Sequence, residues 1–261
     1  MSDEKPRNEE ETLDHLAGDW QILQLAKGHR FSTDDMATAW RGARCLPQAQ
    51  EVLDLGCGIG SVGLMVLHRL GSPTSTLVGV EAQEISVKLA RRTVELNRLA
   101  DRVEIIHGDL RDEGVLPKAS RFELITGSPP YVPLGHGLVS PHPQRAGARI
   151  ELRGSVNDYC LAARRWMAPG GRFCFVMAAA DPRAESAPVE AGLVILERYD
   201  FVFRAGRAPH IATMVCAREE DGPHPPRELG ELVVRGADGQ WTQGYLGFRS
   251  EMGMTQPPRK V

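Results

Sequence analysis

The chain has 261 residues, 42% of them hydrophobic, which is enough for one large domain with a continuous core. Its formal charge of -3 excludes an overall electrostatic attraction to nucleic acid, so any such contact must be local. No apolar run is as long as a membrane span, and the charged first residues differ from a signal peptide, so we expect a cytoplasmic protein without membrane contacts.

We divide the chain into four predicted segments. They are a disordered tail over residues 1–12, a strand pair and a helix over 13–50, the main α/β domain over 51–218, and a C-terminal extension over 219–261. The tail is predicted from its acidic, polar composition, which offers nothing to bury. The extension begins with a stretch rich in proline and charge.

The second segment contains two short apolar runs. Residues 20–25 and 27–31 predict a pair of strands that meet at a glycine. Ser32 and the residues after it then offer side-chain oxygens that can cap free N–H groups. We therefore predict a helix that starts here and runs through Trp40.

From residue 51 onward, strand and helix patterns alternate. The expected strands are 51–55, 77–81, 103–107, 122–126, 172–177, 201–203 and 212–217, with a short one at 231–235 in the extension; the expected helices are 60–70, 84–100, 156–167 and 187–198. Such alternation implies right-handed crossovers between parallel strands. We predict an α/β fold with a Rossmann-like, mainly parallel seven-stranded sheet and helices on both faces.

The first strand of the main domain ends in a glycine turn. Gly56, Gly58 and Gly60 alternate where the strand ends and a helix starts, so the backbone there can closely approach an adenosine cofactor. A dinucleotide fold is the competing interpretation, because residues 58–63 fit G-x-G-x-x-G. Asp54, ahead of the glycines, favours a cationic amino-acid group over a pyrophosphate, and so favours S-adenosylmethionine.

Two further carboxylates end the next strands. Glu81 lies about where a carboxylate meets ribose hydroxyls, which serves either cofactor. Asp109 could accept a hydrogen bond from the adenine amine of the cofactor. Capping of the turn that follows is the alternative role for Asp109.

The fourth strand ends in the turn Ser128-Pro129-Pro130-Tyr131. Two prolines fix this backbone, so the Pro129 carbonyl points in one direction. Paired prolines also terminate strands without any chemical role, which is the structural alternative. A dehydrogenase does not need such a turn, so it favours S-adenosylmethionine as the cofactor.

The glycine turn and the acidic strand ends resemble those of class I S-adenosylmethionine-dependent methyltransferases. The SPPY turn resembles the [D/N/S]-P-P-[Y/F/W] motif of amino-methyltransferases, which implies catalytic roles for Ser128, Pro129, Pro130 and Tyr131. By that resemblance the Ser128 hydroxyl and the Pro129 carbonyl accept the N–H protons of a planar amine, on which Tyr131 stacks. Ser128 replaces the asparagine usual in RNA-adenine and glutamine enzymes, and serine also occurs here in cytosine amino-methyltransferases of DNA.

Looser motifs resemble the bacterial tRNA1(Val) adenine-N6-methyltransferase family. They are the segment from Phe31 to Asp35, the segment 145–151 with its two arginines and Glu151, residues 167–172 and residues 232–242. The resemblance implies that Asp34 lies near the cofactor, that Arg145 and Arg149 approach tRNA phosphates, and that a flipped adenine enters beside Tyr131. The best candidates for a local nucleic-acid contact are the arginines that follow the SPPY turn and could line one rim of a cleft: Arg145, Arg149, Arg153, Arg164 and Arg165. A solvated helix face explains these arginines equally well.

We therefore expect N6 methylation of a tRNA adenine. Methylation of glutamine in a protein such as a release factor, methylation of a small molecule, and a non-catalytic cofactor-binding module are the alternatives. Residues 135–150 are expected to form a mobile substrate loop.

The five cysteines are scattered without a C-x-x-C pair, which predicts reduced, mostly buried thiols. They are Cys45, Cys57, Cys160, Cys174 and Cys216. Because no local ligand spacing accompanies them, we predict no metal site.

Overall fold

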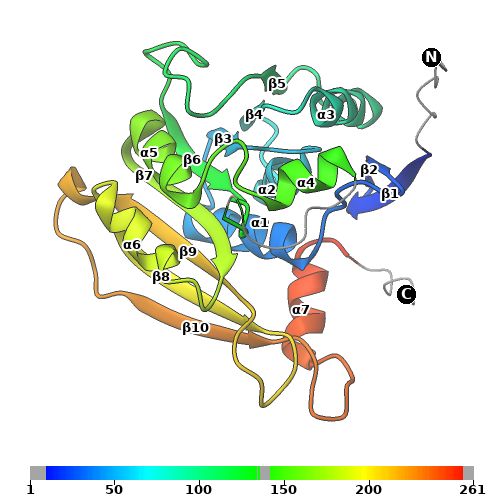
Figure 1. Cartoon of the computed structure of the whole chain (residues 1–261), viewed down its shortest axis with the longest axis vertical. Helices are drawn as coiled ribbons and strands as arrows, with labels where there is room; N and C mark the ends of the chain where they lie inside the picture. Colours follow the sequence, from blue (N-terminus) through cyan, green and yellow to red (C-terminus); the bar gives the residue numbers. More distant parts are fainter. Residues whose placement is uncertain (1–9, 134, 136–141, 255–261) are drawn as a thin grey trace.

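The computed structural model of the chain describes residues 10–133, 135 and 142–254, and it has helices on both faces of one large β-sheet (Figure 1). The strands are β1 (Glu11–Ala17), β2 (Trp20–Leu25), β3 (Glu51–Leu55), β4 (Thr76–Glu81), β5 (Val103–His107), β6 (Phe122–Gly127), β7 (Met167–Ala178), β8 (Leu193–Val202), β9 (Ile211–Arg218) and β10 (Glu228–Val233). The helices are α1 (Thr33–Cys45), α2 (Ser61–Leu70), α3 (Glu84–Leu96), α4 (Pro143–Arg149), α5 (Val156–Trp166), α6 (Arg183–Glu190) and α7 (Gln243–Glu251), with a 3-10 turn at Glu219–Asp221.

The described residues form a large sheet of eight strands in the order β10-β8-β9-β7-β6-β3-β4-β5. β9 is antiparallel to its neighbours β7 and β8, and every other neighbouring pair is parallel. The prediction of a Rossmann-like, mainly parallel sheet is confirmed. It has one strand more than the expected seven, because β10 of the predicted extension pairs with β8. All strands except β9 run the same way, so their carboxyl ends share one side, here called the carboxyl end of the sheet.

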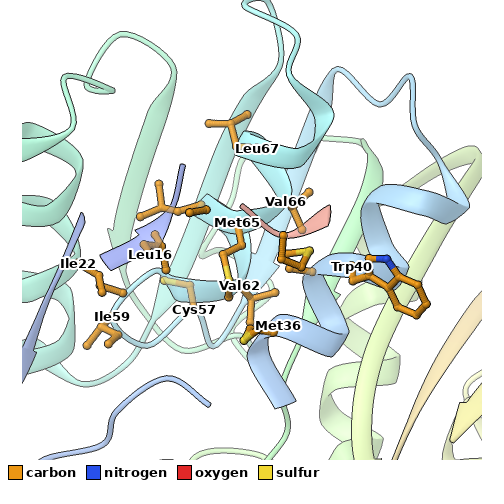
Figure 2. Packing of buried hydrophobic residues seen from close by; sticks show 14 of the residues in the cluster. Leu16, Ile22, Met36, Trp40, Cys57, Ile59, Val62, Met65, Val66 and Leu67 are labelled. Atoms are coloured by element: carbon orange, nitrogen blue, oxygen red, sulfur yellow. The ribbon is translucent and has the colours of Figure 1, made fainter. Parts of the chain in front are cut away.

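Each face of the sheet has its own hydrophobic core. α1, α2, α3 and α7 cover one face together with the β1–β2 hairpin, and their buried side chains form a continuous cluster. Figure 2 shows Leu16 and Ile22 of the hairpin in this cluster with Val62 and Met65 of α2. α5 and α6 cover the opposite face through a second cluster around Trp166. Both faces are therefore removed from water, as a parallel sheet requires.

The N-terminal hairpin lies one strand earlier in the chain than expected. β1 pairs antiparallel with β2, and Gly18 between them has a φ of +54°, which glycine adopts easily in a tight turn. The predicted strand over residues 27–31 is wrong. The amides of His29 and Phe31 donate to glutamine side chains and not to a neighbouring strand.

The predicted disordered tail is wrong at residues 11–12, which begin β1, while residues 1–9 lie outside the described residues. The predicted start of α1 is confirmed. Ser32 caps the helix, because its hydroxyl accepts from the Asp34 amide and its own amide donates to Asp35.

The predicted helix over residues 187–198 is wrong in its second half. α6 ends at Glu190, and Gly192 follows with a φ of +73°, a conformation that stops a helix. Residues after it are rich in β-branched and aromatic side chains and form β8, paired with β9. Pairing with the sheet therefore overrides the helical pattern.

Two helices were not expected from the sequence. α4 lies within the predicted mobile loop over 135–150, of which residues 136–141 are outside the described residues. α7 begins after Thr242, whose hydroxyl accepts from the Tyr245 amide. Its last residue, Glu251, accepts hydrogen bonds from the Trp40 indole at 2.9 Å, from Arg44 at 3.2 Å and from Arg69 at 3.1 Å.

Within the described ranges, no helix combines the length and apolar character that a bilayer crossing requires. The cysteines are free thiols, four of them buried and Cys45 partly exposed. The same ranges hold no cluster of three or more potential metal ligands.

Candidate active site

A cavity lies at the carboxyl end of the sheet, beside the ends of β3, β4 and β6. The space between its protein atoms, with the open mouth included, is about 840 Å³. Ligands of open α/β sheets bind on this side, because the strand ends and the helix N-termini meet there. The wall includes most of the residues predicted from the glycine turn with Asp54 and from the SPPY turn.

The glycine turn forms the floor of this cavity. Gly56, Gly58 and Gly60 have φ values of +59°, +56° and +88°, so all three need the left-handed conformation that glycine tolerates best. Gly56 and Gly58 line the cavity, and a Cβ on Gly58 would meet no atom within 4 Å. Gly60 instead precedes α2 as its N-cap. Gly58 therefore leaves open space for a ligand, whereas the Tyr159 side chain occupies the place of a Cβ at Gly56.

Asp54 lines the cavity but has both carboxylate oxygens in protein hydrogen bonds. It accepts from the Thr126 hydroxyl at 2.8 Å and from the Gly63 amide at 2.9 Å. Burial raises the pKa of this carboxyl to about 7, although the two hydrogen bonds oppose the change. Asp54 therefore connects β3, β6 and α2 in addition to any contact with a ligand.

Glu81 lines the cavity at the end of β4. Its carboxylate accepts from the Gly58 amide at 2.9 Å and from the Gln83 amide at 2.7 Å, so it also fixes the glycine turn. Burial raises the pKa of Glu81, and the positive charge of Arg153 partly opposes this. Arg153, one of the arginines expected to line the rim of a cleft, lines the same cavity.

The adjacent acids Asp34 and Asp35 point to different partners. Asp35 lines the cavity, is 8% exposed, and accepts from the Ser61 hydroxyl at 2.7 Å. Asp34, the predicted cofactor residue, accepts the Tyr131 hydroxyl at 2.7 Å and is not part of the cavity wall. Sequence reasoning missed Asp35, for which the capping motif beginning at Ser32 was the available signal.

The SPPY turn brings Ser128 and Pro130 to the cavity wall. The Ser128 hydroxyl oxygen is buried and has no hydrogen-bond partner among the described residues. A buried hydroxyl without a partner costs free energy, so this oxygen is suited to a bound group. Pro129, also predicted as a catalytic residue, is buried and is not part of the cavity wall.

Tyr131 does not belong to the cavity wall; its ring packs between the two hydrophobic cores. Burial and the neighbouring Asp34 carboxylate raise the pKa of its hydroxyl, so it remains a neutral donor. The hydrogen bond to Asp34 therefore fixes the ring at the end of the turn.

Asp109 turns away from the cavity, whereas its neighbours Gly108 and Leu110 line it. The Asp109 carboxylate accepts from the Arg111 side chain at 2.6 Å and 2.9 Å and from the Arg111 amide at 2.9 Å. These hydrogen bonds lower the pKa of Asp109. This geometry matches the capping alternative, and a contact of Asp109 with adenine stays a prediction.

α4 covers one side of the cavity through Gly147 and Ala148. Its buried Gln144 accepts from the His29 amide at 3.1 Å and donates to the Ser86 hydroxyl at 3.1 Å, which joins α4 to α3 and to the segment before α1. Arg145 and Arg149 are exposed, and neither forms an ion pair with any described residue. The helix that lines the cavity through Gly147 and Ala148 therefore also carries two exposed positive charges.

Tyr159 of α5 is a second residue that sequence reasoning missed. Its ring lies against Gly56 and Gly127, and a Cβ on either glycine would collide with it. The side chain lines the cavity, and burial raises the pKa of its hydroxyl. Because α5 reaches the site only through packing on the sheet, no local motif marked this residue.

Residues 35–185 match the model of a family described as the methyltransferase small domain. The tRNA1(Val) (adenine(37)-N6)-methyltransferase of Actinobacillus pleuropneumoniae is 28% identical over 201 residues, which cover 75% of this chain and 79% of that protein. The protein of the same name from Haemophilus influenzae is 24% identical over 238 residues, covering 87% of this chain and 92% of that protein. The crystal structure of a predicted O-methyltransferase from Agrobacterium tumefaciens has a TM-score of 0.58 at 19% identity, covering 87% of this chain and all of that one, and supports the fold alone.

Proposed function

The chain belongs to the methyltransferase small domain family, and we propose that it methylates the N6 amine of an adenine in tRNA. It is an S-adenosylmethionine-dependent methyltransferase with a class I fold. The acceptor is the part of this assignment that requires a test.

The buried Ser128 hydroxyl is the observation that carries the proposal. It lies at the carboxyl end of β6, on the cavity wall, with no protein partner in the described residues. An exocyclic amine has two N–H donors and a delocalised lone pair, so it reacts only when acceptors hold it in one orientation. Ser128 Oγ and the Pro129 carbonyl would accept these protons, and such positioning needs no covalent intermediate.

The residues of the cavity fit S-adenosylmethionine, which supplies a methyl group on a positively charged sulfonium. Asp35, Asp54 and Glu81 all line the wall, and three carboxylates favour a cationic ligand over a pyrophosphate. We propose that the glycine turn accommodates the amino-acid part and that Glu81 accepts from the ribose hydroxyls. Gly108 and Leu110 would flank the adenine, with Asp109 next to them in the sequence.

RNA as the acceptor is supported by two independent observations. The relatives from A. pleuropneumoniae and H. influenzae are named tRNA1(Val) (adenine(37)-N6)-methyltransferases. Arg145 and Arg149 are exposed on α4, which lines the cavity through Gly147 and Ala148, so they are accessible to RNA phosphates. We propose that a flipped adenine enters between α4 and the SPPY turn, with Tyr131 at its face. A cytoplasmic location stays a prediction that accords with this substrate.

The test is methyl transfer from radiolabelled S-adenosylmethionine to unmodified tRNA and, separately, to cell protein. Nucleoside and peptide mass analysis identifies the product. Label in N6-methyladenosine is the expected result. Label in methylglutamine, in a methylated cytosine or in a small molecule would replace the proposed acceptor. No label in any fraction, with the cofactor bound, would indicate a non-catalytic module.

A further inference from the structure

Two exposed loops lie side by side at the carboxyl end of the sheet (Figure 1), and none of their residues lines the cavity. One covers residues 203–210, between β8 and β9, and the other covers residues 235–241, between β10 and α7. The Ala205 amide donates to the Arg235 carbonyl at 2.8 Å, and the Arg204 guanidinium donates to the Ala237 carbonyl at 3.1 Å. We refer to residues 203–210 and 235–241 together as the paired loops.

The paired loops contain three arginines and one acid, Asp238, so their formal charge is 3 - 1 = +2 with His210 neutral. Arg204, Arg207 and Arg235 are exposed, and within the described part of the chain none of them forms an ion pair. Arg204 and Arg235 donate only to backbone carbonyls, at Ala237 and Gly239. Twelve other arginines among the described residues form an ion pair with a carboxylate, whereas these three do not, so their guanidinium groups can bind an external anion.

The same two loops also contain the aromatic side chains of Phe203, His210 and Trp241. Phe203 is 37% exposed, and its ring centroid lies 4.6 Å from that of His210. Trp241 is partly exposed, and the guanidinium groups of Arg235 and Arg249 lie 5.7 Å and 4.9 Å from its ring centroid. Guanidinium groups bind phosphates, and exposed rings stack on unpaired bases, so this combination is typical of single-stranded nucleic-acid contacts.

The paired loops face the same side as the active site. They follow β8 and β10, which run parallel to β6, and the SPPY turn follows β6. In the sheet order, β8 is three strands from β6 and β10 is four strands away. At about 4.8 Å per strand, the paired loops lie roughly 14–19 Å from the turn across the sheet. One RNA molecule can reach both places.

We propose that the paired loops are a second RNA-docking surface, which binds phosphates and an unpaired base of the substrate outside the methylated site. This inference rests on the proposed function, in which the acceptor is an RNA. Arg145 and Arg149 would guide the reactive nucleotide, whereas the paired loops would hold a more distant part of the same molecule. Two separated contacts explain how a protein of formal charge -3 can bind a polyanion.

The test compares the full-length protein with the variant Arg204→Gln/Arg207→Gln/Arg235→Gln. Binding of fluorescently labelled tRNA is measured by anisotropy at several salt concentrations, and methyl transfer is measured as kcat and KM. We expect Kd and KM for tRNA to rise about tenfold at low salt, and the slope of log K against log salt to fall by about two to three. Binding of S-adenosylhomocysteine and kcat should not change.

The matched control is Arg98→Gln/Lys118→Gln/Arg121→Gln, which removes the same charge. These exposed residues follow α3 or precede β6, and so lie at the opposite end of the sheet. The control should bind tRNA as the unmodified protein does. An equal effect of both triple variants would overturn the inference, since it would show only a response to net charge.

The outcomes for the surface and for the acceptor can be distinguished. If tRNA is methylated but the paired-loop variant retains Kd, KM and salt slope, the docking surface is wrong and the proposed function stands. If the unmodified protein binds tRNA through the paired loops yet labels only protein, the acceptor is wrong and the surface stands. If the variant loses only an interaction with an acidic protein, the surface binds protein and the inference is wrong.

Discussion

The hydroxyl of Tyr131 donates a 2.7 Å hydrogen bond to Asp34, which joins the SPPY turn to the first turn of α1. We expect Tyr131→Phe to keep the ring but lose its fixed orientation, and to lower kcat about tenfold, because a hydrogen bond to a carboxylate contributes about 1.5–3 kcal/mol. Asp34→Asn should have a smaller effect, since the amide oxygen can still accept. Steady-state kinetics with tRNA measure both variants. Equal kcat for Tyr131→Phe and the unmodified protein would remove this positioning role.

Ser128→Ala tests the acceptor role of the unpaired hydroxyl. Since the protein makes no hydrogen bond to this oxygen, its removal should leave the free energy of unfolding nearly unchanged. We expect kcat to fall by roughly tenfold to a hundredfold while the Kd of S-adenosylhomocysteine, measured by calorimetry, stays the same. Ser128→Asn, which restores an acceptor, is the control and should retain more activity than Ser128→Ala. A loss of cofactor affinity equal to the loss of kcat would contradict the assignment.

Gly56 and Gly58 offer a matched pair of alanine substitutions. Both have left-handed φ values, +59° and +56°, so both should incur a similar strain of about 1 kcal/mol. A Cβ on Gly56 would also collide with the Tyr159 hydroxyl, whereas a Cβ on Gly58 meets only open cavity. We expect Gly56→Ala to lower the free energy of unfolding by roughly 2–4 kcal/mol, and Gly58→Ala mainly to weaken cofactor binding.

Urea unfolding and calorimetry separate these two effects. Tyr159→Phe, combined with Gly56→Ala, should recover part of the lost stability because it removes the colliding oxygen. The collision is refuted if the two alanine variants lose the same stability.

The raised pKa of Asp54 predicts a pH-dependent stability. Burial holds this pKa at about 7, whereas an unfolded aspartate titrates near about 3.9, so between these values the folded state keeps a proton that the unfolded chain releases. Stability should therefore fall as pH rises from about 4 to 7 and then level off. In Asp54→Asn this contribution is absent. The variant should gain stability relative to the unmodified protein, by up to a few kcal/mol, across the same window.

Asp54→Asn is a suitable comparison because its amide can keep both contacts. The amide oxygen can accept from the Gly63 N–H, and the Thr126 hydroxyl can turn to accept from the amide nitrogen. Urea unfolding at a series of pH values measures the difference. Asp35 and Glu81 also have raised pKa values, so only the difference between the two proteins reports on Asp54. A stability difference between the two proteins that does not vary with pH would contradict the raised pKa of Asp54.

The sequence predicts best those site residues whose positions follow from the ends of the parallel strands. Gly56, Gly58, Glu81 and Ser128 line the cavity as expected, because each lies where a parallel strand ends, and such ends must converge. The strand positions from 51 to 127 follow from the same hydrophobic alternation. Neither inference needs knowledge of how helices pack.

The remaining parts of the site depend on tertiary contacts. Asp34 and Asp35 are one residue apart, which is about 100° around a helix, so only the docking of α1 decides which one faces the cavity. Tyr159 reaches the glycine turn from α5, more than 100 residues later in the sequence. The Asp109 carboxylate accepts a hydrogen bond from the Arg111 side chain, two residues later. The sequence alone does not decide between this local contact and a contact with a ligand. Helix α4 was predicted as a loop because its segment of the sequence is rich in glycine and proline.

The contact between Glu251 and Trp40 has a consequence for synthesis of the protein. These residues are 211 positions apart, and Phe248 of α7 packs on the Trp40 ring at 5.3 Å between ring centroids. On the ribosome, α1 therefore emerges long before the helix that covers it. Until α7 follows, the part of the Trp40 side chain that α7 covers lacks its partner, and transiently exposed hydrophobic surface of this kind promotes aggregation.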